Sequence, residues 1–163
     1  MARITLKGNP FHTSGELPVK GTVAPDFTLV GLDLAEKRLA DFRGKKVLNV
    51  FPSLDTPVCA LSVRTFNARA AGTPGVTVLN VSADLPFAQK RFCGAEGIER
   101  AVTLSSFRST FARDYGLEIV GGPLEGLCSR AVIVLDEGNR VLYTQQVPEI
   151  AEEPDYDAAL AAL

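Results

Sequence analysis

Two short apolar runs limit, more than any other feature, what this chain can fold into. Residues 47–51 (VLNVF) and 76–81 (VTVLNV) are nearly continuous in apolar side chains, a pattern typical of strands covered on both faces. Each run is followed by a helix-start signal, Thr56 with Pro57 after the first and Asp84 after the second. The alternation predicts parallel strands joined by crossover helices. Right-handed crossovers then place the loops after both strands on one edge of the sheet, where open α/β sheets usually carry their chemistry.

The rest of the chain completes a mixed central sheet with helices on both faces. We expect an N-terminal β-hairpin at 3–6 with a turn at Gly8-Asn9-Pro10, strands at 26–30 and 101–104, a hairpin of 131–135 and 140–144, and helices at 107–115 and 155–160. No repeat, linker or low-complexity tract interrupts the sequence. Residues 1–163 are therefore expected to form one α/β domain.

The two crossover helices have recognisable ends. Thr56 is expected as the N-cap of the first helix, and residues 72–75 (GTPG) are expected to terminate it. Asp84 is expected to cap the second helix, and Gly94 is expected to end it.

Composition excludes several classes of protein. With 46% hydrophobic and 22% charged residues, the 163 residues can form a sizeable core and are neither disordered nor fibrous. The net charge of −2 supplies no basic excess for phosphates, so neither a nucleic-acid nor a membrane partner is expected. No apolar stretch is long enough to span a membrane, and the charged start lacks the apolar core of a signal peptide. We therefore expect a soluble, cytoplasmic protein.

Three cysteines and a single histidine constrain the chemistry. A small and odd number of cysteines does not suit a secreted disulfide framework. No Cys-x-x-Cys occurs, and His12 lies far from every cysteine in the sequence, so no metal or other cofactor is expected. In a reducing compartment such cysteines are catalytic or simply buried.

Cys59 is the strongest candidate for a reactive thiol. If Thr56 caps the helix, Cys59 lies in its first turn, where unpaired N–H groups and the helix dipole favour an anion. Pro52 stiffens the entry to the loop, and the Thr56 hydroxyl is placed to hydrogen-bond the sulfur or a bound oxygen. The residues leave a second interpretation open. Cys59 shares helical spacing with an apolar stripe, Val63, Phe66 and Ala70, and is equally consistent with the end of a core stripe.

Two motifs carry a family resemblance. Residues 52–59 (PSLDTPVC) match the Pro-x-x-x-Thr-x-x-Cys motif of the peroxiredoxins. Residues 82–93 (SADLPFAQKRFC) resemble the signature of one branch, the bacterial thiol peroxidases, which are atypical two-cysteine peroxiredoxins. The segments 8–10 (GNP) and 153–156 (EPDY) are also similar to that branch. The resemblance implies a thioredoxin-like fold and the reduction of hydrogen peroxide and organic hydroperoxides with thioredoxin as reductant.

The resemblance also implies roles for single residues. Cys59 is the peroxidatic cysteine, whose thiolate attacks the peroxide and becomes a sulfenic acid. Pro52 shields that sulfenic acid, Thr56 holds the peroxide oxygens, and Arg130 is the active-site arginine. One argument from the residues supports Arg130: if the strand at 131–135 runs antiparallel to that at 47–51, Arg130 starts at the edge where Cys59 lies. Without the resemblance, a surface arginine flanking a strand is the simpler interpretation.

Cys93 is, by the same resemblance, the resolving cysteine that forms an intramolecular disulfide with Cys59. It lies some two turns, or ~12 Å, along its helix from the catalytic edge, whereas a disulfide needs Cα atoms within roughly 7 Å. One or both helices must therefore unwind locally. Our hypothesis is that Gly94 and Gly97 supply this mobility.

The other polar and aromatic candidates have simpler interpretations. Cys128 matches no family motif and is expected to be structural, although two-residue spacing along a strand places it on the same face as Arg130. The remaining expectations are a turn or surface position for His12, a solvated strand lead-in for Lys45 and Lys46, helix packing for Phe87 and Phe92, and for Phe87, by resemblance, a place in the peroxide pocket.

Two functions compete with a peroxidase. The first is a redox sensor in which a Cys59–Cys93 switch changes the affinity for a partner. The second is a dithiol–disulfide exchange enzyme, against which the absence of Cys-x-x-Cys argues. The resemblance further implies a homodimer packed near the active-site edge, which nothing in the periodicity demonstrates.

Overall fold

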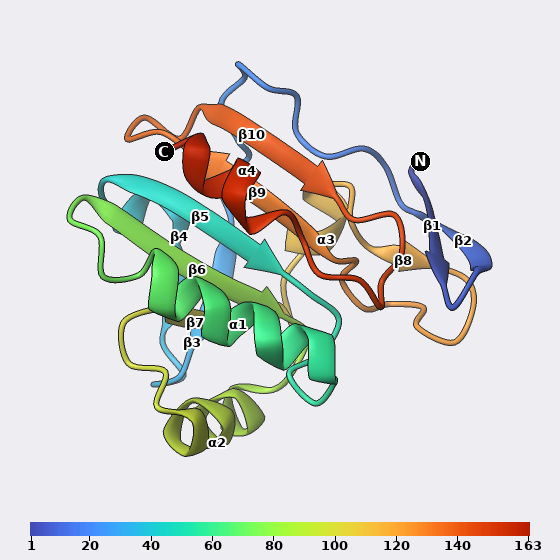
Figure 1. Ribbon diagram of the computed structural model, residues 1–163, viewed down its shortest axis with the longest axis horizontal. Helices are drawn as coiled ribbons and strands as arrows, with labels where there is room; N and C mark the ends of the chain where they lie inside the picture. Colours follow the sequence, from blue (N-terminus) through green and yellow to red (C-terminus); the bar gives the residue numbers. More distant parts are fainter.

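A computed structural model describes residues 1–163 as two sheets with four α-helices (Figure 1). The large sheet has, in spatial order, β10 (Val141–Gln146), β9 (Ala131–Leu135), β5 (Lys45–Val50), β6 (Val76–Ser82), β7 (Val102–Ser105), β3 (Thr28–Gly31) and β4 (Glu36–Arg38). The small sheet has the order β1 (Arg3–Leu6), β2 (Asn9–Thr13) and β8 (Ile119–Val120). The helices are α1 (Pro57–Arg69), α2 (Pro86–Glu96), α3 (Phe111–Asp114) and α4 (Tyr156–Ala161), and a 3₁₀ turn covers Leu39–Asp41.

The centre of the sheet confirms the parallel strands read from the two apolar runs. β5 and β6 are parallel, with Val50 paired to Val81, and β9 lies antiparallel on the other side of β5, with Ala131 paired to Val50. The carboxyl ends of β5 and β6 and the start of β9 therefore meet at one edge. In Figure 1 the loops that lead into α1 and α2 both leave from this edge, on the side of the small sheet.

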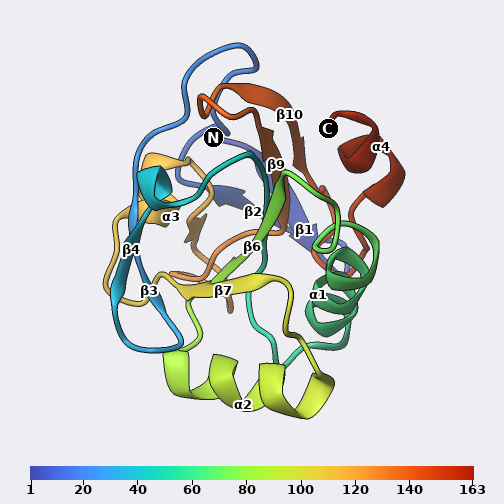
Figure 2. The same ribbon diagram turned by 90° about the vertical axis from the view of Figure 1, so that its left-hand side faces the viewer.

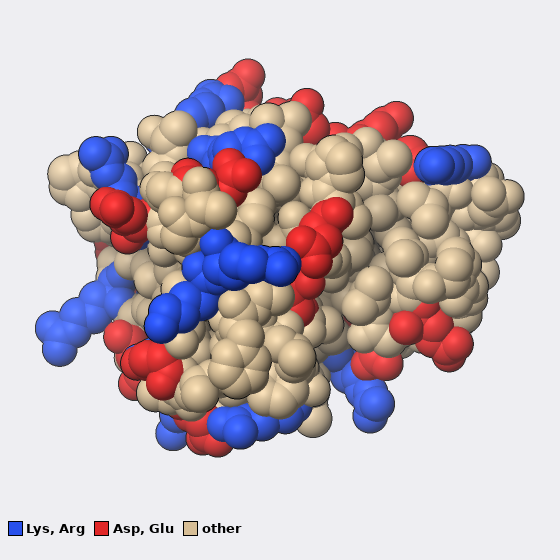
Figure 3. Space-filling model, turned by 90° about the horizontal axis from the view of Figure 1, so that it is seen from below, with Lys and Arg blue, Asp and Glu red and all other residues tan.

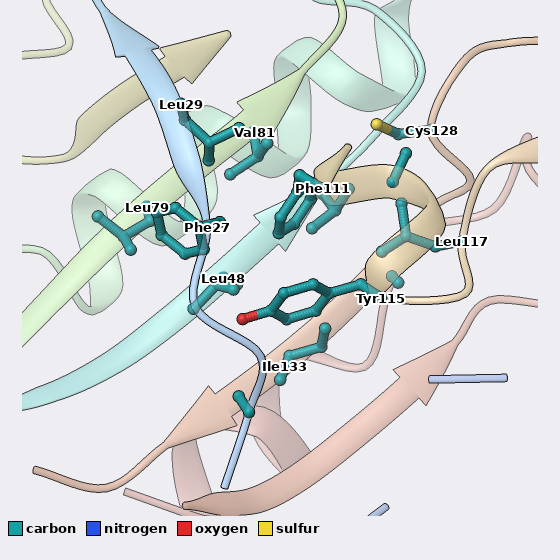
Figure 4. Packing of buried hydrophobic residues seen from close by; sticks show 14 of the residues in the cluster. Phe27, Leu29, Leu48, Leu79, Val81, Phe111, Tyr115, Leu117, Cys128 and Ile133 are labelled. Atoms are coloured by element: carbon teal, nitrogen blue, oxygen red, sulfur yellow. The ribbon is translucent and has the colours of Figure 1, made fainter. Parts of the chain in front are cut away.

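Alternating side chains build a separate core on each face of the large sheet. Figure 2 shows α1 and α4 on one side of the sheet and α3 on the other. On the α3 side, Phe27, Phe111 and Tyr115 pack together, with 5.6 Å between the ring centroids of the two phenylalanines (Figure 4). On the α1 side, Val47, Val78 and Val132 from adjacent strands pack against Phe66 and Ala159. The mixed sheet with helices on both faces is thus confirmed, as is the N-terminal hairpin.

Helix ends differ from the sequence-based expectation at α2 and α3. Gly94 lies inside α2, and the helix ends instead at Gly97, whose φ of 67° gives the left-handed cap. The predicted helix 107–115 shrinks to the single turn of α3. There the Ser105 and Ser109 hydroxyls accept hydrogen bonds from the N–H groups of Phe107 and Phe111. Such local bonds compete with helix formation.

The predicted exposure of one side chain and the predicted burial of another are also wrong. Lys46 is only 1% exposed because its ammonium group donates to the Asn139 side chain at 2.6 Å and reaches the Glu137 carbonyl at 3.4 Å. Burial lowers the pKa of Lys46, which Asp136 partly opposes. Phe87, expected to pack, is 69% exposed on the first turn of α2, whereas Phe92 is partly buried.

None of the helices has the length and apolar character needed to cross a membrane.

Candidate active site

Cys59 is the third residue of α1 and is completely buried. The helix begins at Pro57 with Thr56 in the N-cap position, as predicted. The apolar stripe is confirmed as well, because Val63, Phe66 and Ala70 are all fully buried. Cys59 therefore ends a core stripe and also lies in the first turn of a helix, so the two interpretations left open by the sequence describe one position.

Arg130 contacts the Cys59 sulfur. Its Nη2 donates to Sγ of Cys59 at 3.1 Å, and the arginine is only 1% exposed. The antiparallel pairing of β9 with β5 brings Arg130 to this edge, across 71 positions of sequence. The surface interpretation of Arg130 is therefore wrong. A buried guanidinium beside a sulfur stabilises negative charge on that atom.

One nitrogen of Arg130 is left without a partner. Nε donates to the Ile150 carbonyl at 2.8 Å and Nη2 is used by Cys59, but Nη1 is buried with no hydrogen-bond acceptor. Buried donors are rarely left unpaired. An oxygen atom of a bound ligand is the kind of partner that Nη1 lacks.

The segment that orients Arg130 was missed by the sequence analysis. The Gln146 side chain and the Val147 N–H both donate to the Arg130 carbonyl at 3.0 Å. Ile150, which accepts from the guanidinium, is itself fixed to the N-terminal hairpin because its N–H donates to the Thr5 carbonyl at 2.9 Å. The N-terminal hairpin thus holds the loop that aims Arg130 at Cys59. No spacing signal in the sequence marks Ile150, because it orients Arg130 through its backbone carbonyl and is fixed through its backbone N–H.

An apolar pocket of about 480 Å³ opens beside Arg130. Its lining comes from the N-terminal hairpin, the loop before α1, the first turn of α1 and the segments near residues 127 and 150. The lining residues are Leu6, Lys7, Pro52, Ser53, Thr56, Pro57, Val58, Leu124, Leu127, Arg130, Ile150 and Ala151. Pro52, Thr56 and Arg130 are thus brought together on one cavity, whereas Phe87 is not among its lining residues. The Thr56 hydroxyl donates to the Ser53 carbonyl at 3.0 Å and does not cap the helix.

Asp84 joins the two loops at the edge where β5 and β6 end, and it does not cap α2, whose N-cap is Leu85. Its carboxylate accepts from the Ser53 hydroxyl at 2.7 Å, the Leu54 N–H at 2.8 Å and the Ser82 hydroxyl at 2.6 Å. These three donors occupy the carboxylate, which makes no capping bond to the N-terminus of α2. An Asp before a helix signals a cap by default, so the sequence carried no sign of this role.

Cys93 lies in the same hydrophobic cluster as Cys59, on the α2 side. It is 6% exposed, and its Sγ lies 3.4 Å from the Thr103 hydroxyl of β7. Burial raises the pKa of the Cys93 thiol, and the hydrogen bond with Thr103 partly opposes the shift. All three cysteines are free thiols in this structure.

Cys128 does not share a face with Arg130, contrary to the expectation from alternation. It packs in the core on the α3 side, 3.7 Å from the Ser106 hydroxyl (Figure 4). Alternation fails because β9 begins only at Ala131, so Cys128 precedes the regular strand. Burial raises the pKa of the Cys128 thiol to about 12.

The charged side chains near the site form no broad patch of one sign. On the face seen in Figure 3, which has α2 nearest the viewer, basic and acidic side chains are intermixed. Two exposed ion pairs join the α1 and α2 regions, Arg64 to Glu96 at 3.3 Å and Arg91 to Asp55 at 3.7 Å. No three His, Cys, Asp or Glu side chains gather closely enough to hold a metal ion.

Comparison with known proteins gives consistent matches. A family model described as Redoxin matches residues 19–160. The chain is 60% identical to a thiol peroxidase of Mycobacterium tuberculosis over 164 aligned positions, covering 100% of this chain and 99% of that protein. It is 56% identical to a thiol peroxidase of Corynebacterium glutamicum with the same coverage. Among solved structures, a peroxiredoxin-like protein from Aquifex aeolicus has a TM-score of 0.93 at 41% identity, over 99% of this chain and 95% of that one.

The chain therefore belongs to the Redoxin family, as a peroxiredoxin. Within the peroxiredoxins it groups with the thiol peroxidases, which are oxidoreductases. The family resemblance and the thioredoxin-like fold inferred from the motifs at 52–59 and 82–93 are confirmed.

Proposed function

We propose that this protein reduces hydroperoxides through a two-cysteine cycle that begins at Cys59. The observation that carries the proposal is the 3.1 Å contact between the Arg130 guanidinium and Cys59 Sγ beside an apolar pocket. The Cys59 thiolate attacks the terminal peroxide oxygen, the O–O bond breaks, and the departing oxygen leaves as water or an alcohol after taking a proton. Arg130 Nη1, which has no protein partner, is the group we assign to the peroxide oxygens.

Two further residues of the pocket are assigned supporting roles. Pro52 is buried and offers no N–H, so it keeps water and donors away from the sulfenic acid on Cys59. Thr56 donates its hydroxyl proton to the Ser53 carbonyl, which leaves its oxygen free to accept from a peroxide O–H.

Cys93 is proposed to resolve the sulfenic acid. Its sulfur attacks Cys59 Sγ, the S–S bond forms, the S–O bond breaks, and the hydroxyl leaves as water after taking a proton. The raised pKa of the buried Cys93 keeps it protonated inside the core. Because a thiolate is the better nucleophile, resolution is favoured after α2 opens and Cys93 meets water.

Gly94 is suited to test whether α2 must open. A Cβ added there meets no atom within 4 Å, so Gly94→Ala adds helix propensity without a clash. A gain of about 1 kcal/mol in helix stability lowers the open population, and we expect disulfide closure to slow by about fivefold. The rate is measured by stopped-flow fluorescence or by timed alkylation after one equivalent of peroxide.

The neighbouring exposed Ala95 provides the matched control. Ala95→Gly removes helix propensity one position away and is expected to speed closure by a similar factor. Equal closure rates in Gly94→Ala, Ala95→Gly and the wild type would show that α2 does not unwind.

The apolar lining of the pocket supports organic hydroperoxides as substrates alongside hydrogen peroxide. Leu124→Asn keeps the size of the side chain but makes this wall polar. It is expected to lower kcat/KM for cumene hydroperoxide about tenfold, because apolar contact with the substrate is lost, and to leave hydrogen peroxide within about twofold. Leu61, exposed on α1 and outside the pocket, is the control position for the same substitution. Equal losses for both peroxides would argue against substrate contact at Leu124.

Thioredoxin is proposed as the reductant, in a homodimer packed near the active-site edge. The cycle needs a reducing compartment, so we propose the cytoplasm as its location.

Catalytic turnover separates a peroxidase from a redox sensor and from a dithiol–disulfide exchange enzyme. A peroxidase consumes many equivalents of peroxide per subunit with NADPH, thioredoxin reductase and thioredoxin, whereas a sensor stops after one. A disulfide-exchange enzyme reduces insulin without peroxide. Sedimentation at micromolar concentration tests the dimer.

A further inference from the structure

We infer that Asp84 is a latch that holds the Cys59 loop closed and sets how fast the Cys59–Cys93 disulfide forms. The inference rests on the proposed two-cysteine cycle. Asp84 contacts neither thiol, so it is a positioning residue. It lies between the end of β6 at Ser82 and the start of α2 at Pro86. The loops that follow β5 and β6 leave the sheet at the same edge (Figure 1).

The latch is a set of hydrogen bonds to one carboxylate. Two of its three donors, the Ser53 hydroxyl and the Leu54 N–H, belong to the loop that leads to Cys59. The third, the Ser82 hydroxyl, belongs to the end of β6. An ionised carboxylate is an acceptor only and makes stronger hydrogen bonds than a neutral group. Asp84 therefore ties the Cys59 loop to the central sheet.

Asp84 is also held, through its backbone, next to the helix that carries Cys93. The Asp84 carbonyl accepts from the Ser105 hydroxyl, and α2 begins two residues later at Pro86. The Gln89 side chain, on the first turns of α2, donates to the Ser82 hydroxyl at 3.2 Å. The latch thus joins the segment that carries Cys59 to the segment that carries Cys93.

Closing the disulfide requires this arrangement to loosen. Cys59 and Cys93 are both buried among Phe51, Leu54 and Val63, and neither is bonded to the other. The side chain of Leu54 is 4% exposed in that cluster, while its N–H is held by Asp84. Movement of the loop therefore withdraws Leu54 from the cluster and breaks its bond to Asp84 in one event.

A latch predicts that its loss speeds disulfide closure and leaves the reaction with peroxide almost unchanged. Peroxide reacts in the closed form, where Arg130 contacts Cys59, and the disulfide forms from the open one. When the closed form dominates, a tenfold rise in the open population hardly changes the closed fraction but raises the closure rate tenfold. The oxidised enzyme then spends less time as a sulfenic acid, which a second peroxide converts to sulfinic acid.

The test measures each step in Asp84→Asn and in Ser53→Ala. We expect disulfide closure to be about tenfold faster in Asp84→Asn and about threefold faster in Ser53→Ala. Ser53→Ala keeps the charge of Asp84 but loses the bond to it, together with the bond that the Ser53 hydroxyl accepts from the Asp55 N–H. Sulfenic acid formation is measured for Asp84→Asn in the Cys93→Ser background and should stay within about twofold. The sulfinic fraction at excess peroxide, read by mass spectrometry, falls in proportion to the faster closure.

Asp55→Asn is the matched control, because it neutralises a neighbouring carboxylate in the same loop. Its partner Arg91 is 3.7 Å away and both side chains are exposed, so closure should be unchanged. Hydrogen exchange at Leu54 N–H gives a readout independent of activity and should be faster in Asp84→Asn.

The possible results distinguish a failure of the Asp84 latch from a failure of the proposed two-cysteine cycle. Faster closure with unchanged sulfenic acid formation in Asp84→Asn supports the latch. If Asp84→Asn fails to fold, faster closure in Ser53→Ala supports it. A normal cycle with closure unchanged or slower in the folded variants overturns the latch alone. A wild-type protein that forms no Cys59–Cys93 disulfide overturns the proposed cycle, and the latch with it.

Discussion

Replacing Cys59 with serine is expected to lower the rate of peroxide reduction by on the order of a thousandfold or more, because the hydroxyl that remains is a far weaker nucleophile than a thiolate. The fold should tolerate the change, since serine is close in size and the Ser62 hydroxyl already donates to the Cys59 carbonyl at this turn. Peroxide consumption is measured by stopped flow. Mass spectrometry identifies the oxidised residue in each variant.

Two further variants complete this experiment. Cys93→Ser is expected to react once and stop at a Cys59 sulfenic acid, which a dimedone probe traps. Cys128→Ala is the control, because that thiol is buried in the opposite core with its pKa raised to about 12 and should take no part. If Cys59→Ser consumed peroxide as the wild type does, Cys59 would be only the end of a core stripe.

Replacing Arg130 with glutamine is expected to lower the rate of sulfenic acid formation by roughly 10²-fold to 10³-fold, the range seen when one donor to a developing oxyanion is removed. Two losses contribute to this effect. Negative charge on Cys59 loses its 3.1 Å donor, and the departing peroxide oxygen loses Nη1. Arg130→Lys keeps the positive charge but lacks the planar guanidinium with its several N–H donors. It should therefore recover only part of the rate of sulfenic acid formation.

The readout must separate chemistry from folding. Arg130→Gln also leaves the Ile150 carbonyl without its donor, so a fall in stability of about 1–3 kcal/mol is expected and is measured by urea unfolding. Arg64→Gln is the matched control, because it removes an exposed arginine from the same helix as Cys59. If sulfenic acid formed at equal rates in Arg130→Gln and Arg64→Gln, Arg130 would be only a structural residue.

Family membership and the main architecture were within reach of the sequence. Short apolar runs, Pro57 behind Thr56, and the turn between 131–135 and 140–144 are local signals. Strand pairing and helix starts depend mainly on such signals. The motifs at 52–59 and 82–93 then led to the correct family.

Errors arose where a local signal competes with a distant partner. Asp84 has the sequence context of a helix cap, yet its carboxylate bonds to Ser53 and Leu54, about thirty positions earlier. Lys46 precedes an apolar run and looks solvated, yet Asn139 of the neighbouring hairpin binds its ammonium group. Cys128 was assigned to a face by strand alternation although it lies outside the strand.

The sequence by itself determined the order of strands and helices along the chain, the edge where the loops meet, and Cys59 as the candidate thiol, because these follow from periodicity and from spacing along the chain. Cys93 was singled out by the family resemblance of its motif. Only the tertiary structure decided that the Arg130 guanidinium rests on Cys59, that the Ile150 carbonyl orients it, and that Asp84 ties the two loops together. Each of these contacts joins residues that neither periodicity nor spacing relates. Their geometry exists only once the sheet has brought distant segments of the chain to the same edge.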